Sequence, residues 1–222
     1  MKNRLIVLVC LLVFSSLPIR AALITPAEWT YYIDGVVSDS LLNDPSPVTG
    51  TLLDCLGTLT WSTSVAGSHN FIAFFDYEID EEINHIINET GWSHGTLSTE
   101  QSWEIGEPGY AFGDIYTNVL SGSLDNTNGL EGLTSDASVA LGWSFSLNEL
   151  QTALIALMIT DVAPTSGFYL QQYDPDSHSS VYFSSTLTIS EPSASPVPEP
   201  GTMLLLGCGI IGLSRFGRRL GT

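Results

Sequence analysis

Between Arg20 and Arg215 the sequence has no lysine and no arginine. All six basic residues lie near the two ends, whereas 23 of the 24 acidic residues lie between Leu23 and Pro198, and the formal net charge is −18. A segment with this charge repels phosphate backbones and anionic lipid surfaces, which excludes nucleic-acid binding and basic-patch docking on membranes. It also excludes Lys and Arg salt bridges within that segment.

Cysteine is scarce as well. Cys10 and Cys208 lie in apolar runs near the two ends, which leaves Cys55 alone in the central part of the chain. One thiol cannot form an intramolecular disulfide, and we expect Cys55, on the apolar face of its segment, to be buried and unreactive. With 222 residues and 44% hydrophobic content, the chain is still long enough to bury the core of one domain.

The first 22 residues have the organisation of a secretory signal peptide. Lys2 and Arg4 precede ten apolar residues at 5–14, and the small residues Ala21 and Ala22 follow. The apolar run is too short to cross a membrane as a helix. We therefore predict that residues 1–22 are a signal peptide that is removed by a cut after Ala22.

The C-terminal end consists of a linker, an apolar segment and a basic tail. Residues 191–200 are rich in Pro and Ser and predict an extended linker, because proline continues neither a helix nor a central strand. Residues 201–216 predict a short transmembrane segment that reaches about 24 Å of a hydrocarbon core roughly 30 Å thick. The basic residues at this end of the chain are Arg215, Arg218 and Arg219. They favour a cytoplasmic tail at 217–222, with the acidic body on the opposite side of the inner membrane.

With Pro198, Glu199 and Pro200 ahead of the apolar segment, this order resembles the PEP-CTERM sorting signal of exported proteins. Gly201 follows the motif where Ser or Thr is often found. The resemblance implies an inner-membrane-anchored precursor in a Gram-negative bacterium that makes exopolysaccharide. It also implies cleavage by an exosortase, a membrane cysteine transpeptidase, and transfer to the cell surface or extracellular matrix. Segments 75–80, 142–146 and 182–187 are similar to those of uncharacterised PEP-CTERM proteins, and no activity comes with that similarity.

Residues 23–190 predict a mainly β body. Apolar residues alternate at 139–147, with Trp143 among them, and further strands are expected at 51–61, 69–79, 152–160, 167–173 and 180–189. Successive strands separated by turn residues favour an antiparallel β-sandwich or jelly-roll-like fold. One helix is expected between Asp80 and Glu89, ended by Gly91, and a second short helix at 113–120.

The densest acidic group lies at the end of one predicted strand. Asp76, Glu78 and Asp80 alternate along the chain, and carboxylate oxygens are ligands that suit Ca²⁺. An EF-hand that starts at Asp76 is excluded, because Glu81 stands where Gly is required and Ile87 where a bidentate Glu is required. Two alternatives remain: a structural Ca²⁺ site of another kind, or a solvated acidic strand face. No other cofactor is expected.

Two of the five tryptophans lie among polar residues. Trp92 and Trp103 are expected to be exposed, where indole rings could stack on the sugars of a matrix exopolysaccharide. The alternative is that these two side chains anchor loops. Trp61 and Trp143 lie on apolar strand faces and are expected in the core.

The sequence contains no catalytic pattern. Paired carboxylates would suit a glycoside hydrolase, but among 24 acids some pair always satisfies that requirement. A Gly-x-Ser-x-Gly motif is absent, and the four histidines lack the spacing of a zinc site. The sequence therefore favours a non-enzymatic surface or matrix protein. A polysaccharide-binding module is the alternative, and a glycoside hydrolase is the remaining candidate.

Overall fold

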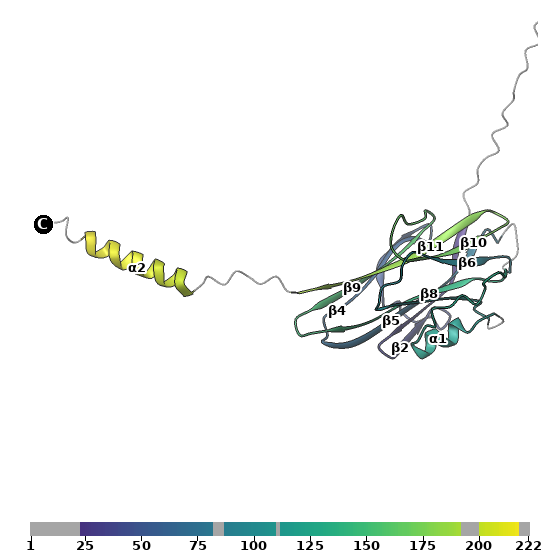
Figure 1. Cartoon of the computed structure of the whole chain (residues 1–222), viewed down its shortest axis with the longest axis horizontal. Helices are drawn as coiled ribbons and strands as arrows, with labels where there is room; N and C mark the ends of the chain where they lie inside the picture. The colour runs from purple at the N-terminus through teal and green to yellow at the C-terminus, as the bar shows by residue number, and fades with distance from the viewer. Residues whose placement is uncertain (1–22, 82–86, 110–111, 192–199, 218–222) are drawn as a thin grey trace, which may run out of the picture.

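The computed structural model describes residues 23–81, 87–109, 112–191 and 200–217, in which eleven strands form two antiparallel sheets (Figure 1). The five-stranded sheet has the order β2–β1–β5–β8–β7, with bounds Val36–Asp39, Ile24–Ile33, Gly67–Ile79, Ser138–Leu147 and Gln101–Gly106. The six-stranded sheet has the order β3–β4–β9–β11–β10–β6, with bounds Thr49–Leu53, Leu56–Thr63, Thr152–Thr160, Ser179–Ser190, Tyr169–Asp174 and Thr90–His94. The predicted antiparallel β-sandwich is confirmed.

The main core lies between the two sheets. Alternate residues of β5 and β8 point inward, among them Phe75 and Trp143, and they meet alternate residues of β9 and β11 such as Ile155 and Phe183. The rings of Phe75 and Phe183 stack across the gap with centroids 5.8 Å apart. Period-two alternation therefore buries one face of each sheet, as the sequence pattern predicts.

A second, smaller core covers part of the outer face of the five-stranded sheet. The helix α1 (Ile115–Ser121) packs Ile115 and Val119 against Ile72 and Phe74 of β5. The helix ends at Gly122, whose φ of 77° is a left-handed conformation that glycine adopts without strain. The short helix predicted at 113–120 is confirmed by α1.

Several predicted elements differ from the observed ones. The strand predicted at 51–61 is a hairpin of β3 and β4, because Asp54 and Cys55 both take positive φ values and turn the chain. Cys55 is half-buried against the main core. The helix predicted between Asp80 and Glu89 falls largely on residues 82–86, outside the described residues. Gly91 lies within β6, against Ile105.

At the two ends, the structure describes only part of what the sequence predicts. The signal peptide at 1–22, Pro198 and Glu199, and the tail residues Arg218 and Arg219 lie outside the described residues. The predicted segment 201–216 is helical as part of α2 (Pro200–Gly217), which also contains Arg215. By length and hydropathy, no helix in the described part of the chain could cross a membrane. The transmembrane segment therefore stays a prediction.

Candidate functional site

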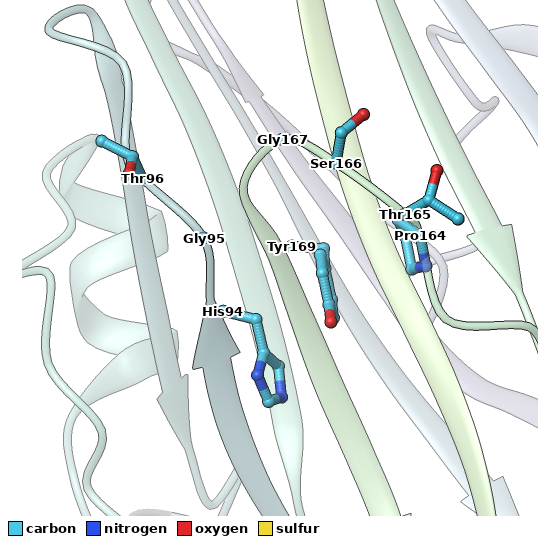
Figure 2. Close-up of a pocket in the computed structure, with 8 residues that line it drawn as sticks. All are labelled: His94, Gly95, Thr96, Pro164, Thr165, Ser166, Gly167 and Tyr169. Carbon is cyan, nitrogen blue, oxygen red and sulfur yellow. The ribbon is translucent and has the colours of Figure 1, made fainter.

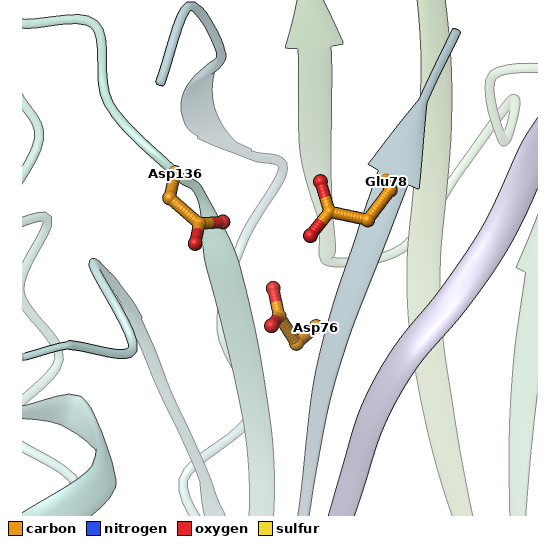
Figure 3. Close-up of side chains that lie close together, drawn as sticks. All are labelled: Asp76, Glu78 and Asp136. Atoms are coloured by element: carbon orange, nitrogen blue, oxygen red, sulfur yellow. The ribbon is translucent and has the colours of Figure 1, made fainter. Parts of the chain in front are cut away.

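Two sites contain side chains that the sequence analysis singled out. The first is an acidic triad, Asp76, Glu78 and Asp136, on the outer face of the five-stranded sheet (Figure 3). One carboxylate oxygen from each residue lies within 4.8 Å of the other two. Asp76 pairs with Ser138 in the β5–β8 ladder, and two further residues in the same register bring Glu78 opposite Asp136. Strand pairing thus joins carboxylates that are about sixty positions apart.

Burial and like charge both act on the triad. Asp76 is 6% exposed, and its burial, followed by the charges of Asp136 and Glu28, raises its pKa to about 8. Burial, a hydrogen bond with Glu81 and the charge of Asp76 raise the pKa of Glu78. The pKa of Asp136 rises to about 6, again mainly through burial. The site favours either protons or a bound cation.

The structure separates Asp80 from the other two predicted ligands. Asp80 has a φ of 58°, which turns its side chain away from the alternation of β5. Its Oδ1 accepts a hydrogen bond of 2.7 Å from the backbone N–H of Leu23. The geometry therefore replaces Asp80 with Asp136 in the candidate set. Sequence reasoning missed Asp136 because only the pairing of β5 with β8 brings it near Asp76.

The second site is the outer face of the six-stranded sheet, which we call the uncharged face. In the described part of the chain its side chains are half-buried or exposed, and α1 lies on the other sheet. None of them is Asp, Glu, Lys or Arg. By strand register they include Thr49, Thr51, Thr58, Thr60, Ser62, Thr90, Trp92, His94, Thr152, Leu154, Ala156, Met158, Thr160, Tyr169, Gln171, Tyr173, Ser180, Tyr182, Ser184, Thr186, Thr188 and Ser190.

Aromatic rings gather at the β6–β10–β11 side of the uncharged face. Trp92 is 43% exposed, and its ring centroid lies 5.6 Å from that of Tyr173. Tyr169 stacks on His94 at 4.8 Å and meets Tyr182 edge-on at 5.9 Å. The prediction that Trp92 is exposed is confirmed. The sequence analysis missed the neighbouring aromatic rings, because the alternation of residues along a strand does not reveal which face of the sheet stays uncovered.

Polar groups hold this aromatic region in place. Gln171 lies between Tyr169 and Tyr173 on β10. Its Oε1 is 2.9 Å from His94 Nε2, and its Nε2 donates a hydrogen bond to Ser180 Oγ at 2.9 Å. Beside it, residues 94–96, 164–167 and Tyr169 line a pocket of about 510 Å³ (Figure 2). His94 and Tyr169 therefore belong both to the lining of this pocket and to the uncharged face.

The structure places Trp103 away from Trp92. Trp103 lies on β7 of the other sheet, half-buried against the main core, with its ring 5.9 Å from that of Phe168. The expectation of an exposed ring at Trp103 is wrong, because its side of β7 faces the core between the sheets. The contact of Trp103 with Phe168 fits the alternative, in which Trp103 anchors a loop.

Comparison with known proteins identifies the C-terminal end. Residues 196–219 match the family model of the PEP-CTERM protein-sorting motif. Searches of curated proteins and of solved structures found no match to this chain. The match covers the linker end, the segment of α2 and the basic tail, so it assigns the sorting signal and leaves the sandwich without an assigned activity.

The chain therefore carries a C-terminal protein-sorting signal. By that signal it is a PEP-CTERM protein. The motif implies secretion, a membrane-anchored precursor and processing by an exosortase in a Gram-negative bacterium.

Proposed function

We propose that this protein is a non-enzymatic component of the cell surface or extracellular matrix, delivered there after exosortase cleavage at Pro198, Glu199 and Pro200. The observation that supports it is the sorting motif at 196–219. The charge distribution agrees with such a route, because the basic residues lie near the ends and leave the body uniformly acidic. The inner membrane then holds only the precursor.

Replacement of Pro198, Glu199 and Pro200 by Ala tests this route. We expect a precursor that stays in the membrane fraction, detected by mass and fractionation in a host with a competent exosortase. Pro192→Ala, in the same linker but outside the matched motif, is the control and should be processed normally. Release of the triple variant at the normal rate and mass would contradict the proposal.

A second candidate function is polysaccharide binding, and the uncharged face favours it. Trp92, Tyr173, Tyr169 and Tyr182 present ring surfaces that suit the apolar faces of sugar rings. Gln171 and the surrounding Ser and Thr hydroxyls add groups that can donate and accept hydrogen bonds. Several rings on neighbouring strands of one sheet face suit an extended chain better than a small ligand.

The charge pattern selects the kind of polysaccharide. The chain carries a net charge of −18, so an anionic polymer would be repelled as it approached. The uncharged face itself offers neither a cation to attract an anion nor a carboxylate to attract a cation. We therefore propose a neutral polysaccharide of the exopolysaccharide matrix as the ligand.

Native affinity electrophoresis tests this binding. Dextran, xyloglucan and galactomannan serve as neutral probes and alginate as the anionic one. At least one neutral polymer should retard the protein, and Trp92→Ala and Tyr173→Ala should each weaken that binding at least tenfold. Phe112→Ala removes a ring of matched exposure, 42%, away from the uncharged face and should bind normally. No retardation by any neutral polymer, or equal losses in all three variants, would contradict the proposal.

A further inference from the structure

We propose that Asp76, Glu78 and Asp136 bind a calcium ion, which links the end of β5 to the segment that leads into β8. The three carboxylates point into a common space (Figure 3), with one oxygen of each within 4.8 Å of the others. The sequence offers no Lys or Arg between Arg20 and Arg215 to balance their charge. A metal ion is the counter-charge that such a body can still recruit.

The environment of Asp76 points to a missing ligand. Asp76 is only 6% exposed, so water has little access to it. Even so, its buried Oδ1 has no hydrogen-bond partner among the described residues. The other buried carboxylates that the structure describes all accept hydrogen bonds: Asp39, Asp80, Glu89, Glu104 and Asp174. Buried polar groups are almost always satisfied, so the exception marks a place where a partner belongs.

The same lack of a partner recurs in the rest of the triad. Glu78 Oε2 and Asp136 Oδ1 are also buried atoms without a hydrogen-bond partner among the described residues. Glu28 pairs with Asp76 across β1 and β5, so a further carboxylate stands on the neighbouring strand. Three unsatisfied acceptors around one space, with more acids beside them, form an arrangement that a cation stabilises and that an empty site does not explain.

The chemistry of the site selects calcium. All protein ligands are carboxylate oxygens, with no His or Cys in the group, which argues against zinc. Two oxygens on one Ca²⁺ at about 2.3–2.6 Å can lie up to about 5 Å apart, which matches the 4.8 Å limit of the triad. Mg²⁺ demands near-ideal octahedral geometry and gives up its water reluctantly, so it is usually held by only one or two carboxylates. Glu78 and Asp136 are only half-buried, so water can complete the coordination shell.

Calcium titration of the full chain, purified in detergent, tests the proposal. Isothermal titration calorimetry should detect one Ca²⁺ per chain, with a dissociation constant between about 10⁻⁴ and 10⁻³ M, as in extracellular calcium-binding modules. The melting temperature should rise more in CaCl₂ than in NaCl of equal ionic strength, because only a specific ligand shifts the folding equilibrium beyond screening. MgCl₂ should have a smaller effect than CaCl₂.

Asp76→Asn and Asp136→Asn should each weaken Ca²⁺ binding at least tenfold. Asp161→Asn, at an exposed position on the same protein, is the matched control and should bind normally. Asp80→Asn should also bind normally, which separates the structural set of ligands from the set that the sequence predicts. Far-UV circular dichroism checks that each variant is folded, and Asp136→Asn keeps the test valid if Asp76→Asn does not fold.

Three outcomes would overturn the proposal. Equal melting shifts in CaCl₂ and matched NaCl would show that the triad feels only screening and holds protons in place of metal. Unchanged Ca²⁺ affinity in both Asp76→Asn and Asp136→Asn would place the ion elsewhere. Loss of affinity in Asp80→Asn but not in Asp136→Asn would favour the ligands that the sequence predicts, with Asp80 in place of Asp136. None of these results depends on polysaccharide binding or on sorting.

Discussion

Asp80 is 5% exposed, and its carboxylate accepts a hydrogen bond of 2.7 Å from the backbone N–H of Leu23. The backbone N–H of Asp80 in turn donates to Leu23 O at 2.8 Å. Leu23 is also the first residue after the predicted signal-peptide cut. Cleavage there would turn this amide nitrogen into an ammonium group. The hydrogen bond to the carboxylate would then become an ion pair, in a body that has no Lys or Arg.

At the residue scale we therefore predict that the charge on the Leu23 amino group stabilises the mature chain. The chain that begins at Leu23 should be about 0.5–2 kcal/mol more stable at pH 6 than its N-acetylated form, because the ammonium adds Coulomb attraction to a hydrogen bond that the acetylated amide also donates. Denaturant unfolding of the two forms measures the difference. Asp80→Asn should abolish this difference. Equal stability of the free and the N-acetylated chain, both with Asp80 intact, would contradict the prediction.

At the element scale, Ser185 links the two sheets. Its Oγ, on β11 of the six-stranded sheet, accepts from Trp143 Nε1 of β8 at 2.9 Å and from Gln101 Nε2 of β7 at 3.1 Å. All three side chains are buried. One hydroxyl thus satisfies two donors that would otherwise be buried without an acceptor.

We predict that Ser185→Ala lowers the free energy of unfolding by about 1–3 kcal/mol, the cost of leaving buried donors unpaired. Ser184→Ala is the control, because Ser184 points outward on the same strand, and it should change stability by less than about 0.5 kcal/mol. Urea denaturation compares the two variants. Similar losses in both would show that Ser185 acts through strand propensity and not through its hydrogen bonds.

Strands differ in how well the sequence predicts them. The strand predicted at 152–160 coincides with β9, because its apolar residues are continuous and its ends are marked by turn residues. By contrast, β1, β2, β6 and β7 were not predicted. β6 has five residues and carries Gly91 and an exposed Trp92, so its strand conformation depends on pairing with β10 and not on a local pattern.

At the scale of the whole molecule, buried acids make stability depend on pH. Burial raises the pKa of Glu89 to about 8 and that of Glu104 to about 6, whereas an unfolded chain titrates Glu near 4.3. The folded state therefore binds more protons than the unfolded state between about pH 4 and pH 8. Stability is greatest at the acid side of this window and falls as pH rises through it.

We predict that, in chelator, the melting temperature of the mature chain falls from pH 5 to pH 8. Added NaCl should narrow the gap, because it screens the charges of neighbouring carboxylates that help to raise these pKa values and leaves the burial cost in place. Differential scanning calorimetry at both pH values, with and without salt, measures this. A melting temperature that is constant or that rises toward pH 8 would contradict the assigned direction of the pKa shifts.

The sequence by itself determined the sorting signal, the acidic body and the β-sandwich class. Each of these depends on residues that are close together in the chain or on composition. The motif at 196–219 is continuous, the absence of Lys and Arg is a count, and the alternation through Trp143 spans only ten residues of β8. Such features can be identified without knowing which strands pair.

Only the tertiary structure decided which side chains meet. Alternation shows that Asp76 and Glu78 share a face, but the register of β5 with β8 is what adds Asp136, and a turn at Asp80 is what removes that residue. Trp92 and Trp103 have similar sequence surroundings, yet one lies on an uncovered face and the other packs against the core. A site on a sheet depends on pairing between distant strands and on what covers each face, and neither is encoded in a local pattern.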